Sequence, residues 1–500
     1  MKNYLKYIGI LALGMVACEP EFENPVDEQG AYENGEADFT NYVALGNSLT
    51  AGYADNALYI TGQEQSYPNI LAQQFAKVQQ TEEFRIPYMN DNAGGLLAGD
   101  QQITQNRLVL SIIDGDTLPR VYTGMTPTTN VVNGLDGYYN NMGVPGAKSF
   151  HLLAPNYGDL TGLMSQPATA NPYFVRFASS PSATVVEDAV AQDPTFFSLW
   201  IGNNDVLGYA TSGGLNEDEI TNPQYFTGVY SKIVESLTAN GAQGVLLNIP
   251  YVTDVPFFTR VPVKAIPLDE QTATMLNTRF VGYNEQILPG LAQMGEISPE
   301  EMQQRQINFT AGQNFVTLTD DQLTDITQII QGPPFNLDEQ TANMLGQLRQ
   351  ATSADLIPLT SSGILGTTVG DDPTMINGVS VPLGDQHVLT WGEQNLITNA
   401  TDQYNQTIKS LAEANGLAFV DAAGMLSEVA GEGIPFDGGT VTSDFVTGGA
   451  FSLDGIHLTP RGYALVANRI IEAVNETYNS TVPKVNIGNY GTVTPSNDVK

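Results

Sequence analysis

Short apolar runs alternate along this chain with segments whose apolar residues recur at helical spacing. Residues 42–45, 195–201 and 244–250 are almost continuously apolar, which is typical of parallel strands buried on both faces. Residues 185–191 and 225–239 instead have the pattern of amphipathic helices. This alternation predicts an α/β layered fold with a mainly parallel sheet.

The same pattern resumes in the C-terminal part of the chain. We expect a helix over residues 391–415, a strand over residues 416–421 and a long amphipathic helix over residues 461–478. The tail that follows Pro483 is polar, and we expect it to be loosely ordered.

Two stretches interrupt the alternation and indicate insertions. At about residues 100–125, two apolar runs flank D-G-D (residues 114–116), which predicts a hairpin. Residues 253–390 contain L-D-E-Q-T-A-T-M-L (residues 268–276) and L-D-E-Q-T-A-N-M-L (residues 337–345), and both copies have acidic residues where a helix would begin. Two copies are too few for a solenoid, so we expect a largely helical insertion or cap.

The N-terminus has the features of an export signal. Lys2 and Lys6 precede an apolar segment, residues 7–16, that is too short to span a bilayer. Small residues then lead to Cys18, the only cysteine in the chain. Residues 1–17 therefore resemble a bacterial lipoprotein signal, which implies a lipid anchor on Cys18 and a place in the cell envelope, at the outer membrane. The alternative is an ordinary cleaved signal followed by a chance cysteine.

Residues 18–38 are acidic, contain Pro and Gly and lack periodicity, which predicts a flexible tether. The whole chain has 54 acidic and 19 basic residues, a net charge of −35. This balance argues against nucleic acid as a partner and against adsorption to an anionic membrane surface. No Cys/His cluster or H-E-x-x-H motif predicts a metal, and we expect no cofactor; the acidic pair at residues 371–372 is only a weak signal for calcium.

Candidate chemistry begins directly after the first apolar run. Gly46 and Asn47 tolerate the backbone angles of a sharp turn, and Ser48 follows them. A serine on a tight strand-to-helix turn is held clear of the sheet, as hydrolases present a nucleophile. An ordinary turn remains the alternative for this stretch considered alone.

A serine nucleophile needs a base and a group that orients the base. The chain has three histidines, and His457 alone has a carboxylate at close spacing, Asp454. The alternative is that Asp454 caps the helix expected from residue 461. We expect His151 and His387 to be surface or structural residues that take no part in the chemistry.

Four short motifs occur in order along the chain. They are G-N-S-L-T (residues 46–50), G-V-P-G (residues 143–146), G-N-N-D (residues 202–205) and D-G-I-H (residues 454–457). Together they resemble the signature blocks of the SGNH/GDSL hydrolase family. The resemblance implies a three-layer α/β/α flavodoxin-like fold over residues 39–500, interrupted by the two insertions.

Carried over by position, the resemblance implies a role for each site residue. Ser48 would be the nucleophile, His457 the base and Asp454 the orienting acid. The oxyanion donors would be the backbone N–H groups of Ser48 and Gly146 and the side-chain amide of Asn204. Two neighbours of these residues are not expected to take part in catalysis. Asn47 stands where the family motif has Asp, and we expect this difference to have little consequence. We expect Asp205 to have a structural role.

The resulting hypothesis is a carboxylic ester hydrolase that forms an acyl-enzyme on lipid or acyl esters. A carbohydrate O-acetylesterase is the alternative enzyme, and it would need an open cleft lined by aromatic residues. A surface binding protein that kept the fold and lost activity is the alternative from another class. The sequence leaves the oligomeric state open.

Overall fold

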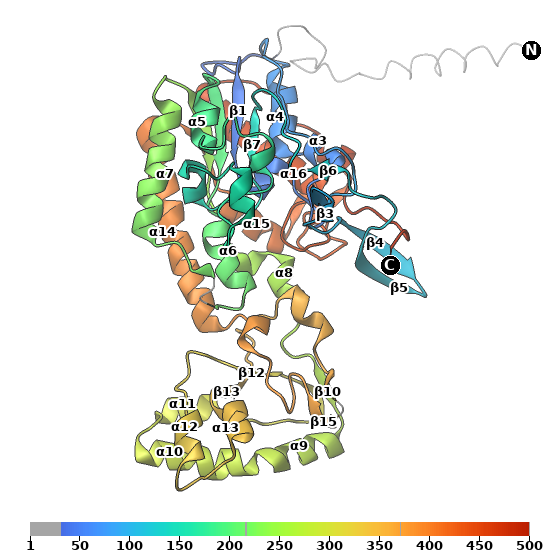
Figure 1. Ribbon diagram of the computed structural model, residues 1–500, viewed down its shortest axis with the longest axis vertical. Helices are drawn as coiled ribbons and strands as arrows, with labels where there is room; N and C mark the ends of the chain where they lie inside the picture. The colour runs from blue at the N-terminus through green and yellow to red at the C-terminus, as the bar shows by residue number, and fades with distance from the viewer. Residues whose placement is uncertain (1–31, 216–217, 371, 500) are drawn as a thin grey trace, which may run out of the picture.

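The computed structural model describes residues 32–215, 218–370 and 372–499. Figure 1 shows that they form an α/β body and a smaller lobe, joined by a narrow junction. The predicted signal at residues 1–17, Cys18 and residues 18–31 of the predicted tether lie outside the described residues. Among the described helices, none is long and apolar enough to cross a bilayer.

The body is built on a five-stranded sheet in which every neighbouring pair of strands is parallel. Its order corresponds to 2-1-3-4-5 when the strands are counted along the chain, which is the flavodoxin-like order. The predicted α/β fold is therefore confirmed. From edge to edge the strands are β7 (Asn141–Gly143), β1 (Tyr42–Gly46), β8 (Phe196–Trp200), β9 (Gln243–Leu247) and β16 (Ala418–Val420).

Strand β7 corrects one prediction, because only a loop was expected from the sequence at this position. Asn141–Gly143 pairs with the C-terminal half of β1, from Ala44 to Gly46. The strand is three residues long and only its middle residue, Met142, is a large apolar residue. A short edge strand of this composition has no apolar run by which to recognise it.

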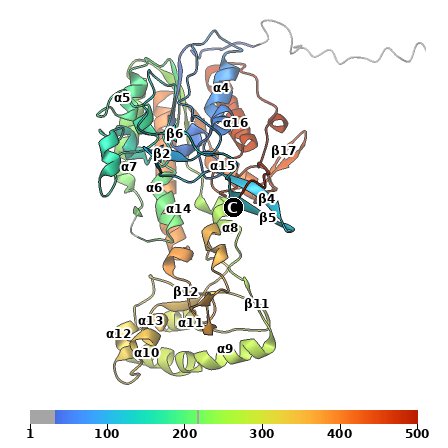
Figure 2. The ribbon, with the colours of Figure 1, turned by 45° about the vertical axis from the view of Figure 1, so that its right-hand side comes forward.

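Helices cover both faces of the sheet and give the three layers (Figures 1 and 2). On one side, α16 packs against α4 and against β16 and β9. On the other side, α14 packs against α7 and α6, and α5 packs against β1. The bounds are α4 (Tyr67–Phe75), α5 (Val185–Val190), α6 (Asn204–Thr211), α7 (Pro223–Thr238), α14 (Trp391–Asn415), α15 (Ala422–Ala430) and α16 (Pro460–Tyr478).

The smaller lobe, here called the cap lobe, comprises most of residues 260–390 and has a hydrophobic core of its own. Each copy of the near-repeat (residues 268–276 and 337–345) starts one helix of the cap lobe. The side chains of Asp269 and Asp338 cap these helices, because each accepts a hydrogen bond from a backbone N–H in the first turn. The helices are α9 (Glu270–Gly282), α10 (Leu288–Met294), α11 (Pro299–Gln304), α12 (Thr327–Gln331) and α13 (Glu339–Leu345). Short strand pairs join them: β10 (Ile266–Leu268) with β11 (Gly312–Asn314), and β12 (Thr317–Thr319) with β13 (Leu348–Gln350).

The prediction that the C-terminal tail is loosely ordered is wrong, because the tail packs against a hairpin of the body. β4 (Leu108–Ile113) and β5 (Asp116–Val121) form the antiparallel hairpin. The tail runs beside β4, where Leu110 donates to the Thr494 carbonyl at 2.9 Å and accepts from the Ser496 N–H at 3.0 Å. The free edge of the hairpin thus supplies the hydrogen bonds that composition alone does not reveal.

Residues 32–38 also differ from the flexible tether expected there. The Glu36 N–H donates to the Tyr478 carbonyl at 2.7 Å, and Ala37 is buried. The Gln243 side chain accepts from the Asp38 N–H at 2.9 Å. This segment therefore belongs to the body, at the edge of the sheet where β9 begins.

Candidate active site

The turn that carries Ser48 is shaped by its two preceding residues. A Cβ atom at Gly46 would lie 2.3 Å from the Trp200 carbonyl oxygen of the neighbouring strand, so the close approach requires glycine. The Asn47 side chain accepts from the Leu49 N–H at 3.0 Å and thereby caps α2 (Ser48–Ala51). Ser48 is consequently the first residue of a helix and stands at the carboxyl end of β1.

Asn47 also contacts the turn that follows β8. Besides capping α2, its amide nitrogen donates to Asn203 Oδ1 at 3.0 Å. An aspartate at this position would cap the helix equally and could accept a hydrogen bond from the Asn203 amide. Asn47 therefore joins the turn after β1 to the turn after β8.

Three of the predicted site residues are hydrogen-bonded in series. Ser48 Oγ lies 2.8 Å from His457 Nε2, and His457 Nδ1 lies 2.9 Å from Asp454 Oδ2. His457 and Asp454 belong to the loop before α16. The alternative role of Asp454 as a helix cap is wrong, because Thr459 caps α16.

The carboxylate of Asp454 is buried and held in its ionised form. Its Oδ1 accepts from the N–H groups of Ile456 and His457, both at 2.8 Å, and its Oδ2 accepts from the Asn56 N–H at 2.8 Å. Burial by itself raises the pKa of this carboxyl, but the His457 side chain and these backbone hydrogen bonds outweigh it and hold the pKa well below its usual range. Asp454 is therefore a fixed negative charge beside His457 Nδ1.

A second turn, which sequence reasoning missed, supports the Asp454 loop. Asp55 and Asn56 both have left-handed backbones, with φ of 53° and 62°. Asp55 Oδ1 accepts from the Leu453 N–H at 3.1 Å and its Oδ2 from the Tyr59 hydroxyl at 2.8 Å, and burial raises the pKa of Asp55 to about 6. The Asp-Asn pair was a turn signal in the sequence, but its partner, Leu453, lies almost 400 positions away.

The aromatic ring of Tyr53 also contacts the site. Its centroid lies 4.6 Å from that of the His457 imidazole. This contact limits rotation of the imidazole between Ser48 and Asp454.

A hydrogen bond joins Asn204 to Ala147, the residue that follows Gly146. Asn204 is the first residue of α6, and its amide donates one hydrogen to the Ala147 carbonyl at 2.9 Å, which leaves the second hydrogen for another acceptor. Gly146 is exposed and has φ of 80°, a conformation that favours glycine. Within the described part of the chain, the backbone N–H groups of Ser48 and Gly146 have no acceptor.

Asp205 is structural, as expected. It is buried and accepts from both the N–H and the hydroxyl of Ser149, each at 2.7 Å. This pair of hydrogen bonds ties the loop that contains Gly146 to the first turn of α6. It therefore fixes Gly146 relative to Asn204.

Ser48, Asn204 and His457 line one pocket that opens to solvent. Its wall includes Val255, which belongs to the segment that leads into the cap lobe. The next helix, α8 (Pro256–Thr259), contacts the Asp454 loop, because the Phe257 N–H donates to the Gly455 carbonyl at 3.0 Å. The other lining residues are mostly aliphatic: Asn47, Leu49, Trp200, Asn203, Val206, Leu207, Pro250, Tyr251, Val252, Leu426, Ile456 and Leu458.

The other two histidines lie outside this cavity. His151 Nδ1 accepts from the Lys148 N–H at 3.0 Å, its ring stacks on Tyr157, and burial lowers its pKa to about 4. His387 Nδ1 lies 3.1 Å from the Ser361 hydroxyl in the cap lobe. Both environments are structural ones.

Comparison with known families agrees with this arrangement. The model of the family described as GDSL-like Lipase/Acylhydrolase matches residues 42–315, which is more than half of the chain. The match includes Ser48, Gly146 and Asn204 and ends before Asp454 and His457. Comparisons with curated proteins and with solved structures gave no match. The chain therefore belongs to the GDSL-like lipase/acylhydrolase family, whose members hydrolyse esters.

Proposed function

We propose that the protein is a serine carboxylic ester hydrolase that cleaves lipid or acyl esters through an acyl-enzyme. The observation that carries the proposal is the hydrogen-bonded series Ser48–His457–Asp454, with distances of 2.8 and 2.9 Å. The series opens into a cavity at the carboxyl ends of the parallel strands. That edge is where folds of this strand order bind ligands.

The first half of the reaction transfers the acyl group to Ser48. His457 Nε2 takes the Ser48 hydroxyl proton as Oγ attacks the ester carbonyl carbon. The bond from this carbon to the alkoxy oxygen then breaks, and His457 returns the proton to the leaving alcohol. Asp454 keeps Nδ1 protonated, so that Nε2 is free to accept, and stabilises the imidazolium that forms.

The second half repeats these steps with water. His457 takes a proton from water as its oxygen attacks the acyl carbon, the bond to Ser48 Oγ breaks, and Oγ recovers the proton. In both halves the carbonyl oxygen carries a developing negative charge. The N–H groups of Ser48 and Gly146 and the second amide hydrogen of Asn204 supply its donors.

Replacement of Asn204 by alanine is expected to lower kcat about 10²- to 10³-fold with little change in KM, because the amide bonds the oxyanion more strongly than the ground-state carbonyl. Steady-state kinetics on a p-nitrophenyl ester would measure the loss. Asn203→Ala, in the same cavity, is the matched control and should lose less than about tenfold. Equal losses in the two variants would argue against an oxyanion role for Asn204.

The aliphatic wall of the cavity favours an acyl chain over an acetyl group as the substrate. Trp200 and Tyr251 are the only aromatic residues besides His457 among its lining residues, whereas a carbohydrate esterase would need an open aromatic-lined cleft. We further propose that a lipid anchor on Cys18 holds the enzyme at the cell envelope. Lipid and acyl esters would be available to it there.

Chain length is therefore the property that tests the substrate class. We expect kcat/KM on p-nitrophenyl esters to rise from acetate towards longer acyl chains, by up to about fourfold per methylene until the cavity is filled, since each buried methylene contributes about 0.8 kcal/mol. Ser48→Ala serves as the background control. An optimum at acetate would support the O-acetylesterase, and absence of both turnover and fluorophosphonate labelling of Ser48 would support an inactive binding protein.

A further inference from the structure

Three carboxylates meet where the cap lobe joins the α/β body. Asp321 follows β12, Asp385 begins a short 3-10 turn (Asp385–His387), and Glu393 lies in the first turn of α14. One oxygen of each lies within 4.8 Å of the other two. The cluster thus combines two segments of the cap lobe with the helix that leads back into the body.

Much of the hydrogen-bonding capacity of this cluster is unused. Glu393 is fully buried, and its Oε2 accepts from the N–H and the hydroxyl of Thr390 at 2.6 and 2.9 Å. Its Oε1 and both carboxylate oxygens of Asp385 are buried and have no partner among the described residues. The chain also closes around Glu393, because a Cβ atom at Gly214 would lie 1.9 Å from Oε1.

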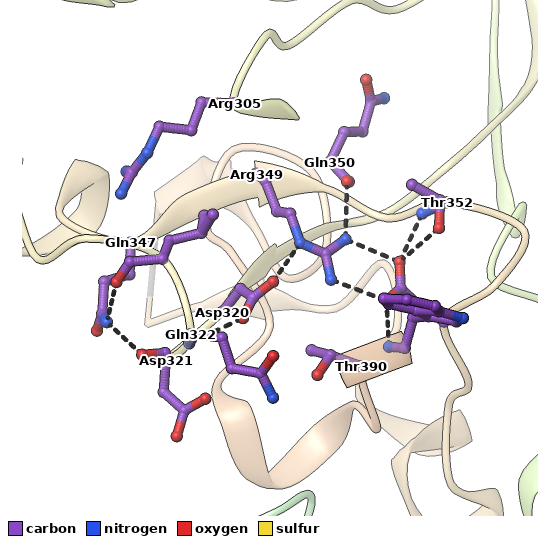
Figure 3. Close-up of polar contacts among 12 residues, drawn as sticks. Arg305, Asp320, Asp321, Gln322, Gln347, Arg349, Gln350, Thr352 and Thr390 are labelled. Carbon is purple, nitrogen blue, oxygen red and sulfur yellow. Dashed lines mark hydrogen bonds and ion pairs between the residues drawn. The ribbon is translucent and has the colours of Figure 1, made fainter. Parts of the chain in front are cut away.

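Arg349, which pairs with the neighbouring Asp320, does not neutralise the cluster. Arg349 bonds Asp320 at 2.6 Å and Asp355 at 2.7 and 2.8 Å, which fully engages its charge. Figure 3 shows this arrangement, with the carboxylate of Asp321 pointing away from the guanidinium. Within residues 32–215, 218–370 and 372–499, none of the three cluster carboxylates forms an ion pair.

Asp321 is exposed, whereas the unpartnered oxygens of Asp385 and Glu393 are buried and therefore costly to hold ionised. A cation between the three carboxylates would remove this penalty. Three carboxylate oxygens within 4.8 Å of one another can ligate one calcium ion, which takes oxygen ligands at about 2.3–2.6 Å in flexible geometry, whereas magnesium demands a near-ideal octahedron at about 2.0–2.1 Å.

We propose that Asp321, Asp385 and Glu393 bind a calcium ion that fastens the cap lobe to the α/β body. The ion joins the two lobe segments to the start of α14, which packs along the body beside α6 and α7. The wall of the catalytic cavity includes Val255, at the other connection to the cap lobe. Calcium therefore stabilises the junction, and its binding does not depend on the proposed esterase reaction.

Calcium binding to the full chain tests this proposal. The protein is treated with a chelator, exchanged into chelator-free buffer at about pH 8, and titrated with calcium chloride in a calorimeter. We expect one site with a Kd below about 1 mM and an increase of about 3 °C in the midpoint of thermal unfolding at saturation. No binding to the wild-type chain, or tighter binding of magnesium than of calcium, would overturn the assignment.

Two variants locate the site. Glu393→Gln keeps an oxygen that can accept from Thr390, and Asp385→Asn disturbs no hydrogen bond, so both should fold; if one does not, the other decides. Each should weaken calcium binding at least tenfold, while the unfolding midpoint without calcium stays the same or rises because one buried charge is gone. Glu296→Gln, at an exposed position of the cap lobe, is the matched control and should bind calcium normally. Unchanged binding in Glu393→Gln or Asp385→Asn would refute the site.

Discussion

Replacement of Ser48 by alanine is expected to lower kcat for ester hydrolysis by about 10⁶-fold, to the level that remains when a whole catalytic triad is lost. Alanine removes the only oxygen within hydrogen-bond distance of His457 Nε2 in the described residues, so no acyl-enzyme can form. The backbone N–H of residue 48 and the amide of Asn204 are unaffected. The variant should therefore still bind substrate, with KM or Kd changed only slightly.

A matched control is available in the neighbouring strand. Ser198 is also buried, and its hydroxyl lies 2.7 Å from the Tyr42 hydroxyl inside the sheet. Ser198→Ala should lower the free energy of unfolding by about 1 kcal/mol and leave kcat unchanged. Circular dichroism would confirm that both variants fold. Turnover of Ser48→Ala within tenfold of the wild type would rule out this serine as the nucleophile.

The sheet could be predicted from sequence where its strands are central. β1, β8 and β9 are runs of buried apolar residues, and burial on both faces is what makes such runs continuous. β7 was not predicted because an edge strand of three residues needs few apolar side chains. Its pairing with β1 is decided by tertiary contacts and not by its own composition.

The site was predictable to the extent that its residues follow strand ends. In a parallel sheet all carboxyl ends meet at one edge, so the segments containing Ser48 and Asn204, which follow predicted strands, were bound to approach one another. Gly146 follows β7, which was not predicted, so only the family motif indicated its place in the site. His457 could be paired with Asp454 because the two are only three residues apart. Asn56, which donates to Asp454, could not be found this way, since nothing local links positions so distant in the chain.

The cap lobe was the least predictable part. Its helices begin at recognisable capping residues, Asp269 and Asp338, but its core and its junction depend on contacts between distant segments. Asp321, Asp385 and Glu393 lie in three separate segments with no ligand motif. Only the folded junction places their carboxylates together, so the sequence predicted no metal there.

Replacement of Asp454 by asparagine is expected to lower kcat by about 10⁴-fold. Although the hydrogen bond from the Asn56 N–H is lost, the Asn side-chain oxygen can still accept from the N–H groups of Ile456 and His457, which hold the loop in shape. Its amide nitrogen, however, would face His457 Nδ1 as a donor. That contact favours the tautomer with the hydrogen on Nε2, which cannot accept the Ser48 proton.

The pH dependence follows from the same carboxylate. Because the folded-state pKa of Asp454 lies well below its usual value of about 3.9, its contribution to stability is present above that pH and is lost only as the pH falls through the lower, folded-state value. Between about pH 5 and pH 9 the wild-type enzyme therefore keeps this charge, and Asp454→Asn should be impaired across the whole range.

Asp55→Asn is the matched control for this experiment, because Asp55 is buried beside the same loop and accepts from Leu453 and Tyr59 without touching His457. We expect it to lose less than about tenfold in kcat, since it supports the loop and leaves the tautomer of His457 unchanged. A kcat for Asp454→Asn within tenfold of the wild type, together with inactivity of Ser48→Ala, would reduce the catalytic unit to Ser48 and His457. A loss of kcat that is pronounced in Asp454→Asn and small in Asp55→Asn would instead show that the Asp454–His457 hydrogen bond keeps Nε2 free to accept a proton.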